Sequence, residues 1–274
     1  MTMAPSPDSR RPMDPAAPLW TPPLVPELQA ERPRADQQTE VGRPGRELCI
    51  YPASLGYDLQ QELEFLSNRV MEPNIFFSAR LLAPAMPRIE DKQVRFAVLR
   101  DENEGRSRMR LLMPFTIEKP GFSIGPAITR AWANPFGPLG TPLVDAEGAA
   151  ETIDNLLDGL SRPDMQLPSV LVLPQIRVNG RFAQLARAVA VGRDLPVTLA
   201  EPGTRPMLES VEAPETYLKR AVSPHHYREM QRQWRRLAEH GQLDYTVARQ
   251  PEEVRLRMEE FLALEAAGWK GRKR

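Results

Sequence analysis

The stretch QVRFAVLR, residues Gln93–Arg100, alternates in polarity in the way that a half-buried β-strand does. The polar turn DENEGR at 101–106 separates it from a second apolar run at 109–116, so the two runs predict an antiparallel hairpin. A continuous apolar run, SVLVL at 169–173, lies between two prolines and is typical of a buried central strand. Because helical patterns separate these strands, the sequence predicts an α/β fold with a mixed sheet of the α+β kind.

Apolar residues recur at helical spacing in several other segments, which predict helices at 59–71, 78–85, 146–160, 182–191, 214–218, 224–239 and 251–267. Ser223 and Pro224 are suited to the N-cap and first position of the helix at 224–239. Short strands are expected around 48–51, 195–199 and 243–248, and a strand or extended loop around 122–132.

Residues 1–46 contain ten of the 29 prolines and few large apolar side chains. Such a segment buries too little surface to offset the entropy lost on ordering, so we expect a disordered, proline-rich tail that ends near Glu47. Within it, PPLVP at 22–26 either docks into an aromatic groove of a partner or belongs to an unstructured leader.

The 36 basic residues are balanced by 36 acidic ones, so no general attraction to nucleic acid or to an anionic membrane is expected. The single Cys49 excludes an intramolecular disulfide, and its apolar neighbours favour a buried core thiol over a nucleophile. No apolar run approaches the roughly 20 residues of a membrane span, and no secretory signal is recognisable. We therefore expect a cytoplasmic protein without a membrane span.

The segment 227–240 is rich in arginine, which suits phosphates and other anions, but its two glutamates favour a solvated or inter-domain face. Adjacent histidines, His225 and His226, point in different directions on a helix, so we expect no metal site there. Motifs of zinc peptidases, α/β-hydrolases and P-loop enzymes do not occur. The arginines concerned are Arg228, Arg232, Arg235 and Arg236.

The segment RVNGRF at 177–182 is similar to the loop Arg/Gln-x-x-Gly-x-Gly/Ala, with which acetyltransferases hold the coenzyme A pyrophosphate on amides at a helix N-terminus. Arg177 and Gly180 are therefore candidate cofactor-binding residues. The sixth position of this loop is small in acetyltransferases, whereas this chain has Phe182. The alternative is a plain turn from strand to helix.

Four segments together resemble the CelD-type branch of the GNAT acyltransferase superfamily, whose layout is related to the FemAB aminoacyl transferases. The resemblance spans residues 47–271 and lies in segments that occur in the same order and spacing. These are EPNIFFS at 72–78, GTPLVD at 140–145, the arginine-rich helix that ends with LAEHG at 237–241, and FLALEAAGWKG at 261–271.

The resemblance implies two GNAT-like domains in tandem, of which the first is degenerate and the second binds acetyl-CoA or another acyl-CoA. It places the degenerate domain at 47–206, a connecting helical arm at 207–241, and the start of the second domain at 242–274. Because the sequence stops soon after FLALEAAGWKG, we expect a truncated fragment that lacks the catalytic half.

In such an enzyme an amine or hydroxyl attacks the thioester carbonyl, a backbone amide stabilises the oxyanion, and a base removes the proton. Polysaccharide or envelope biosynthesis is one setting for this transfer. By position, the candidate catalytic residues are Glu265, Trp269 and Lys270. The alternative function is a non-catalytic GNAT scaffold that presents the arginine-rich helix to a partner protein.

Overall fold

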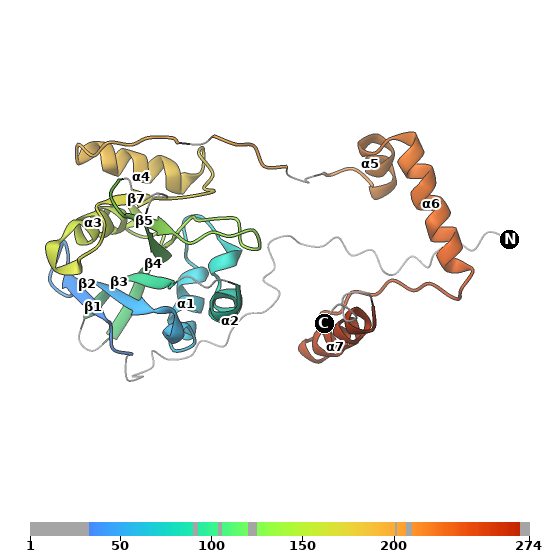
Figure 1. The fold of residues 1–274 in the computed structure, drawn as a ribbon, viewed down its shortest axis with the longest axis horizontal. Helices are drawn as coiled ribbons and strands as arrows, with labels where there is room; N and C mark the ends of the chain where they lie inside the picture. The colour runs from blue at the N-terminus through green and yellow to red at the C-terminus, as the bar shows by residue number, and fades with distance from the viewer. Residues whose placement is uncertain are drawn as a thin grey trace. The chain divides into compact units, whose positions relative to one another are not determined.

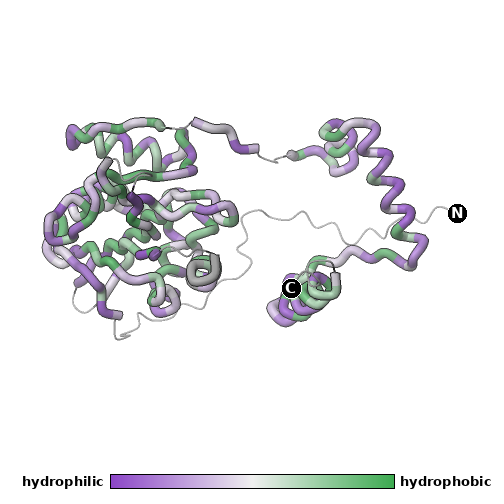
Figure 2. Tube along the Cα trace, in the orientation of Figure 1, coloured by the Kyte–Doolittle hydropathy of each residue, from purple (hydrophilic) through white to green (hydrophobic). Residues whose placement is uncertain are grey.

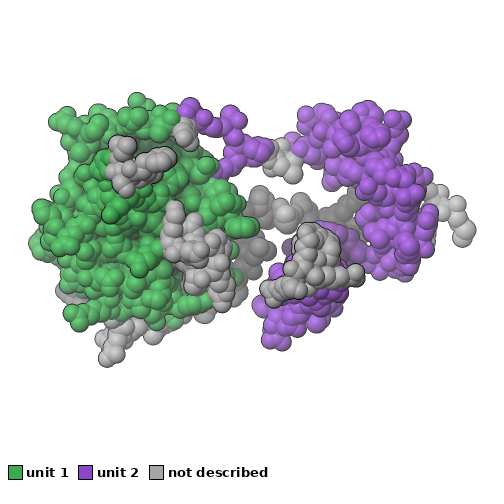
Figure 3. All heavy atoms as spheres, viewed as in Figure 1, with its two compact units in different colours: residues 1–200 green, residues 201–274 purple. Residues whose placement is uncertain are grey.

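The computed structural model describes residues 33–89, 93–103, 106–119, 125–200, 202–206 and 210–268. The chain divides into two compact units, residues 1–200 and 201–274 (Figure 3). The predicted disordered tail over residues 1–32, including PPLVP, lies outside the described residues.

The first unit is built on a curled, mixed sheet, which confirms the predicted α/β class (Figure 1). Neighbouring strands follow the order β1-β2-β3-β4-β5-β7, and β6 also pairs with β4. Every pair is antiparallel except β5 and β7, which are parallel. The predicted hairpin is confirmed as β3 and β4. The strands are β1 (Gln37–Glu40), β2 (Arg46–Pro52), β3 (Arg95–Asn103), β4 (Arg106–Glu118), β5 (Ile128–Ala131), β6 (Leu143–Val144) and β7 (Val170–Val172).

Helices cover both faces of the sheet, and the alternation of the strands sorts the core into two clusters. Cys49 and Val98 face α1 (Gln60–Ser67) and α2 (Ala79–Ile89), where Leu63, Leu66 and Leu82 are buried. The alternate strand residues, among them Leu48 and Leu99, face α3 (Ala149–Ser161) and α4 (Arg181–Gly192), where Ile153, Leu156 and Phe182 are buried. Cys49 is therefore the buried core thiol that the sequence predicted.

β5 and β6 together form one interrupted strand beside β4. Ala131 of β5 pairs with Phe115, and Leu143 of β6 pairs with Leu112 of the same strand. The residues between them, 132–142, leave the sheet as a loop. This loop follows the carboxyl end of β5 and forms part of the candidate site.

The second unit contains the three predicted helices, α5 (Pro214–Ala221), α6 (Pro224–Ala238) and α7 (Pro251–Ala267). The predicted N-cap of α6 is confirmed, because the hydroxyl of Ser223 accepts a hydrogen bond from the amide of His226. None of these three helices contains a buried residue. Within the described residues, no helix is both long and apolar enough to span a bilayer.

Several predicted boundaries were wrong. Residues 37–40, assigned to the disordered tail, form edge strand β1, which pairs through its backbone with β2. α1 ends at Ser67 instead of residue 71. The side chains of Ser67 and Asn68 donate hydrogen bonds to backbone carbonyls four residues earlier, which competes with continuation of the helix. Val70 then pairs with Asp145 in an isolated β-bridge. Residues 195–199 and 243–248 form no strand in the structure.

Candidate functional site

The candidate site lies where the parallel strands β5 and β7 end. Parallel neighbours have their carboxyl ends at the same edge of a sheet, so the loops 132–142 and 173–180 leave the sheet side by side. The amide of Gly140 donates a hydrogen bond of 3.1 Å to the carbonyl of Pro174, which joins the two loops. Ligands of open α/β sheets bind outside the carboxyl ends of the strands, so this edge of the sheet is the candidate binding site.

A third segment, the chain that follows α1, packs against the first of these loops. The amide of Met71 donates to the carbonyl of Val144 at 2.9 Å. The buried Asn74 donates through Nδ2 to the carbonyls of Leu139 at 2.9 Å and Thr141 at 2.8 Å. Two of the segments on which the family resemblance rests, 72–78 and 140–145, are thus in direct contact.

Glu72 reaches from this segment to the N-terminus of α4. Its Oε2 accepts a hydrogen bond of 2.9 Å from the amide of Phe182, and the side chain is only 7% exposed. A carboxylate in this position satisfies one of the free amides of the helix and interacts favourably with the helix dipole. Glu72 belongs to the motif EPNIFFS, but nothing in the sequence marks it as a site residue.

Gly180 leaves room for this carboxylate. A Cβ atom at position 180 would lie 2.7 and 2.8 Å from the two oxygens of Glu72, closer than van der Waals contact allows. The glycine therefore gives the carboxylate access to the helix end. This is a structural reason for a glycine that the sequence analysis selected as a cofactor-binding candidate.

The loop 177–182 connects β7 to α4, as the similarity to the coenzyme A loop requires. Arg177 is exposed, whereas Phe182 is buried in the core between the sheet and α3. A pyrophosphate bound at this helix N-terminus would lie beside the Glu72 carboxylate on the amide of Phe182, and two anions cannot sit there without strong repulsion. The roles of Arg177 and Gly180 in cofactor binding stay predictions.

The loop 132–142 carries buried polar atoms in addition to its backbone. Trp132 Nε1, Asn134 Nδ2 and Thr141 Oγ1 find no hydrogen-bond partner among the described residues. The ring of Trp132 stacks on Phe77 at a centroid distance of 6.4 Å, which holds the loop against the segment after α1. Because buried polar groups are normally paired, this loop has unused hydrogen-bonding capacity.

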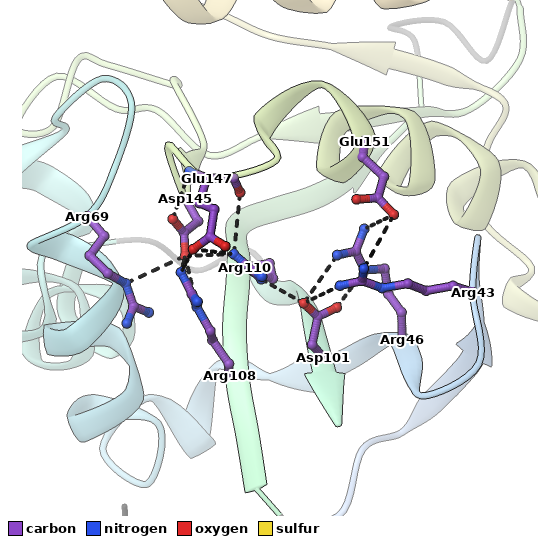
Figure 4. A network of polar contacts seen from close by, with 9 residues as sticks. All are labelled: Arg43, Arg46, Arg69, Asp101, Arg108, Arg110, Asp145, Glu147 and Glu151. Carbon is purple, nitrogen blue, oxygen red and sulfur yellow. Dashed lines mark hydrogen bonds and ion pairs between the residues drawn. The ribbon is translucent and has the colours of Figure 1, made fainter. Parts of the chain in front are cut away.

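A network of arginines and carboxylates lies beside the site, near the N-terminus of α3 (Figure 4). At its centre, Asp145 is 1% exposed and accepts hydrogen bonds from Arg108 at 2.8 Å and from Arg110 at 3.3 Å. Arg69 lies 3.5 Å from the same carboxylate. These contacts connect β4 and the end of α1 to the turn that precedes α3, and they fix the start of that helix.

Asp101 forms the second centre of this network. Its carboxylate accepts hydrogen bonds from Arg46 at 2.6 Å and from Arg110 at 2.7 Å. Burial by itself would raise the pKa of Asp101, but the hydrogen bonds and charges of Arg46 and Arg110 outweigh that effect and lower the pKa to about 2. Arg110 bridges Asp101 and Asp145, so the network is continuous and its charges are closely balanced.

The predicted catalytic residues lie elsewhere in the chain. Glu265 is half-buried on α7 in the second unit, and Trp269 and Lys270 lie outside the described residues. Among the residues that the structure describes, no group of three or more His, Cys, Asp and Glu side chains is placed to hold a metal ion. The structure thus brings together Arg177 and Gly180 at one site, with Glu72 as their neighbour.

No protein-family model, curated protein or solved structure matches the chain.

Proposed function

We propose that residues 33–200 form a non-catalytic, GNAT-like scaffold domain that belongs to an acyltransferase of the CelD-like or FemAB-like tandem type. The observation that carries this proposal is the hydrogen bond of the Glu72 carboxylate to the amide of Phe182. It places an anion of the protein itself at the helix end that would otherwise receive the pyrophosphate of coenzyme A.

Three observations support the GNAT-like part of the proposal. The first unit has a mixed α/β sheet. The loop 177–182 lies between a strand and a helix N-terminus, where a coenzyme A loop is needed. The segments 72–78 and 140–145, which the resemblance selected independently, form hydrogen bonds with each other.

The proposal that the domain is non-catalytic rests on the charge and the space at the N-terminus of α4. Glu72 is 7% exposed and its carboxylate is held at the amide of Phe182. Gly180 leaves room for the carboxylate, and the bulky Phe182 occupies the position that is small in acetyltransferase loops. Both features fit a domain with a GNAT-like layout in which a side chain stands where coenzyme A would bind.

In this proposal the acyl transfer from acetyl-CoA or another acyl-CoA to an amine or hydroxyl belongs to the domain that begins near residue 242. Glu265, Trp269 and Lys270 are its candidate catalytic residues, and 207–241 is the connecting helical arm. The polysaccharide or envelope precursors that such a cytoplasmic enzyme would modify are the proposed acceptors. The first unit would then support this domain and take no part in the chemistry.

Calorimetric titration of the full chain with acetyl-CoA tests the scaffold assignment. We expect no saturable binding at the loop 177–182, because the Glu72 carboxylate already occupies the amide of Phe182 and would repel a second anion there. Arg177→Ala is the matched variant, since Arg177 is exposed and its loss should not disturb the fold. Saturable binding that Arg177→Ala removes would contradict the proposal and would make this loop the cofactor site.

A further inference from the structure

One side of α6 carries a row of exposed apolar side chains. The residues Tyr227, Met230, Trp234 and Leu237 follow each other at spacings of three and four, which places them within about 80° of one another around the helix axis. Met230, Trp234 and Leu237 are 46%, 60% and 53% exposed. We call these four residues the α6 seam. Large apolar side chains exposed in a row mark an interaction surface.

The rest of α6 is polar and strongly basic. Four arginines and one glutamate give the helix a net charge of +3, and Figure 2 shows it as a mostly hydrophilic helix. All four arginines are exposed and lie on the side away from the seam, as the helical period requires. The glutamate, Glu229, accepts hydrogen bonds from Arg232 at 2.6 and 2.8 Å, so it presents no unpaired negative charge. The arginines are Arg228, Arg232, Arg235 and Arg236.

α6 is held as a helix by its own ends. The hydroxyl of Ser223 accepts a hydrogen bond of 3.3 Å from the amide of His226, and Pro224 takes the first helical position. Arg235 and Arg236 stand in the last turn, where the helix dipole favours positive charge. Because the helix is already formed, little ordering entropy is lost when it binds a surface.

The interface of an anionic bilayer satisfies both sides of α6 at once. Nucleic acid on the arginines would leave the seam in water, and a protein on the seam would leave the arginines unused. In a bilayer interface the acyl chains receive the seam, while lipid phosphates surround the opposite side of the helix. Helices of low overall hydrophobicity, with Trp and Leu on one side and arginine on the other, bind in this position. Trp234 and Tyr227 have the amphipathic rings that favour this boundary.

We propose that α6 is an interfacial helix that binds the surface of an anionic membrane. The seam enters between the lipid headgroups, and Arg228, Arg235 and Arg236 interact with their phosphates. The balanced charge of the whole chain argues against a general attraction to membranes, whereas the positive charge of α6 is local. Binding of this kind is peripheral and needs no membrane-spanning helix. The second unit would then hold the protein at a membrane surface.

Flotation of the full chain with lipid vesicles tests this inference. The vesicles consist of phosphatidylcholine with or without phosphatidylglycerol, an anionic lipid. We expect saturable binding that is at least about tenfold tighter with phosphatidylglycerol, because each arginine near an anionic surface adds to the affinity. This binding should weaken as sodium chloride is added. Equal binding to both kinds of vesicle, or no binding to the anionic ones, would overturn the proposal.

Trp234→Glu should weaken binding to the anionic vesicles at least about tenfold, because it places a charge in the middle of the seam. Trp234 is exposed, so helix content by circular dichroism should not change. Tyr245→Glu is the matched control, since Tyr245 is an aromatic residue of the same unit that lies outside α6 and is 86% exposed. Binding that survives Trp234→Glu unchanged would be that of a general site for polyanions and would overturn the proposal.

Removal of arginines tests the polar side of α6. Replacement of both Arg235 and Arg236 by Gln should weaken binding to anionic vesicles about tenfold or more. The matched control replaces Arg255 and Arg257 of α7 by Gln, which removes the same charge from the chain at exposed positions of another helix. We expect the control to bind nearly as well as the natural chain. Equal losses in the two variants would show that α6 is not the membrane-binding element.

Discussion

Glu72 and Phe182 are 110 residues apart in sequence and are joined by a hydrogen bond of 2.9 Å between a carboxylate oxygen and a backbone amide. This contact ties the segment after α1 to the first turn of α4. It satisfies a helix end that the chain leaves without a capping side chain of its own, since the N-cap residue is Gly180. The position, the charge and the burial of Glu72 all agree with a structural anion.

Replacement of Glu72 should destabilise the first unit in a graded manner. Glu72→Ala leaves the amide of Phe182 unpaired in a buried site, and we expect a loss of about 2–3 kcal/mol in the free energy of unfolding. Glu72→Gln keeps an oxygen acceptor and loses the charge, so about 1 kcal/mol is expected. Urea denaturation followed by circular dichroism measures both. Equal and negligible losses would show that the contact contributes nothing.

Gly180→Ala should act through Glu72. The new methyl group would displace the carboxylate, so the variant should lose about 1–3 kcal/mol of stability in the natural background. In the Glu72→Ala background only the carbonyl of Arg177, at 3.0 Å, remains close to the methyl group, so the same change should cost less. A double-mutant cycle of the two substitutions measures the coupling. Additive losses would mean that Gly180 and Glu72 are independent.

Arg100 is a buried cation that forms an ion pair with Glu62 of α1. Its side chain is fully buried, and Nη1 lies 3.3 Å from the carboxylate of Glu62 on α1. Glu62→Ala should lower the free energy of unfolding by about 2–4 kcal/mol, because it removes the only counter-ion that Arg100 has among the described residues.

Glu64→Ala is the matched control for Glu62→Ala. Glu64 lies on the same helix and faces the exposed Arg80 at 3.5 Å, so its loss should change stability by less than about 1 kcal/mol. Thermal or urea unfolding of the two variants gives the comparison. Losses of similar size would contradict the importance of the buried charge.

Asp101 should make the first unit sensitive to acid. Its pKa of about 2 in the folded state lies below the ordinary value of 3.8, so its contribution is complete above the ordinary value and is lost as the pH falls toward 2. The size of this contribution is about 2 kcal/mol. Asp101→Asn should be less stable at neutral pH and should show a shallower loss of stability below pH 5 or so. An unchanged slope would mean that Asp101 is not a principal acid-sensitive group.

The sequence predicted the central hairpin of the sheet and misjudged its edges. The run 169–173, predicted as a buried central strand, is the edge strand β7, whose Val170 is exposed. β3 is not the half-buried strand that its polarity pattern predicted: it is buried on both faces, because one face packs under α1 and α2 and the other under α3 and α4. β1, with the sequence QQTE, is held by backbone hydrogen bonds to β2 and has no apolar pattern to reveal it. β6 has two residues and is positioned by its neighbours in the sheet.

Residues 195–199 show the opposite error. Leu195, Val197 and Leu199 alternate as in a strand, yet all three are exposed, because the segment pairs with no strand of the described residues. Alternation gives a segment the capacity to form a strand, and a sheet edge within reach is needed to realise it.

The candidate site was only partly predictable. Similarity to a known loop selected Arg177 and Gly180, and the resemblance quoted the motif that contains Glu72. The contact between Glu72 and the N-terminus of α4 joins segments more than 100 residues apart, and no local sequence pattern indicates it. The network around Asp145 depends on the same kind of long-range pairing, since its arginines come from β4 and from the end of α1 (Figure 4).

The most direct test of the account is to follow the amide resonances of Gly180 and Phe182 by NMR while acetyl-CoA is added to the isotope-labelled chain. If the Glu72 carboxylate occupies the N-terminus of α4, neither resonance should shift, even at acetyl-CoA concentrations well above those that saturate acyltransferases. A saturable shift of both resonances, absent in Arg177→Ala, would contradict the account and would place the cofactor in the first unit.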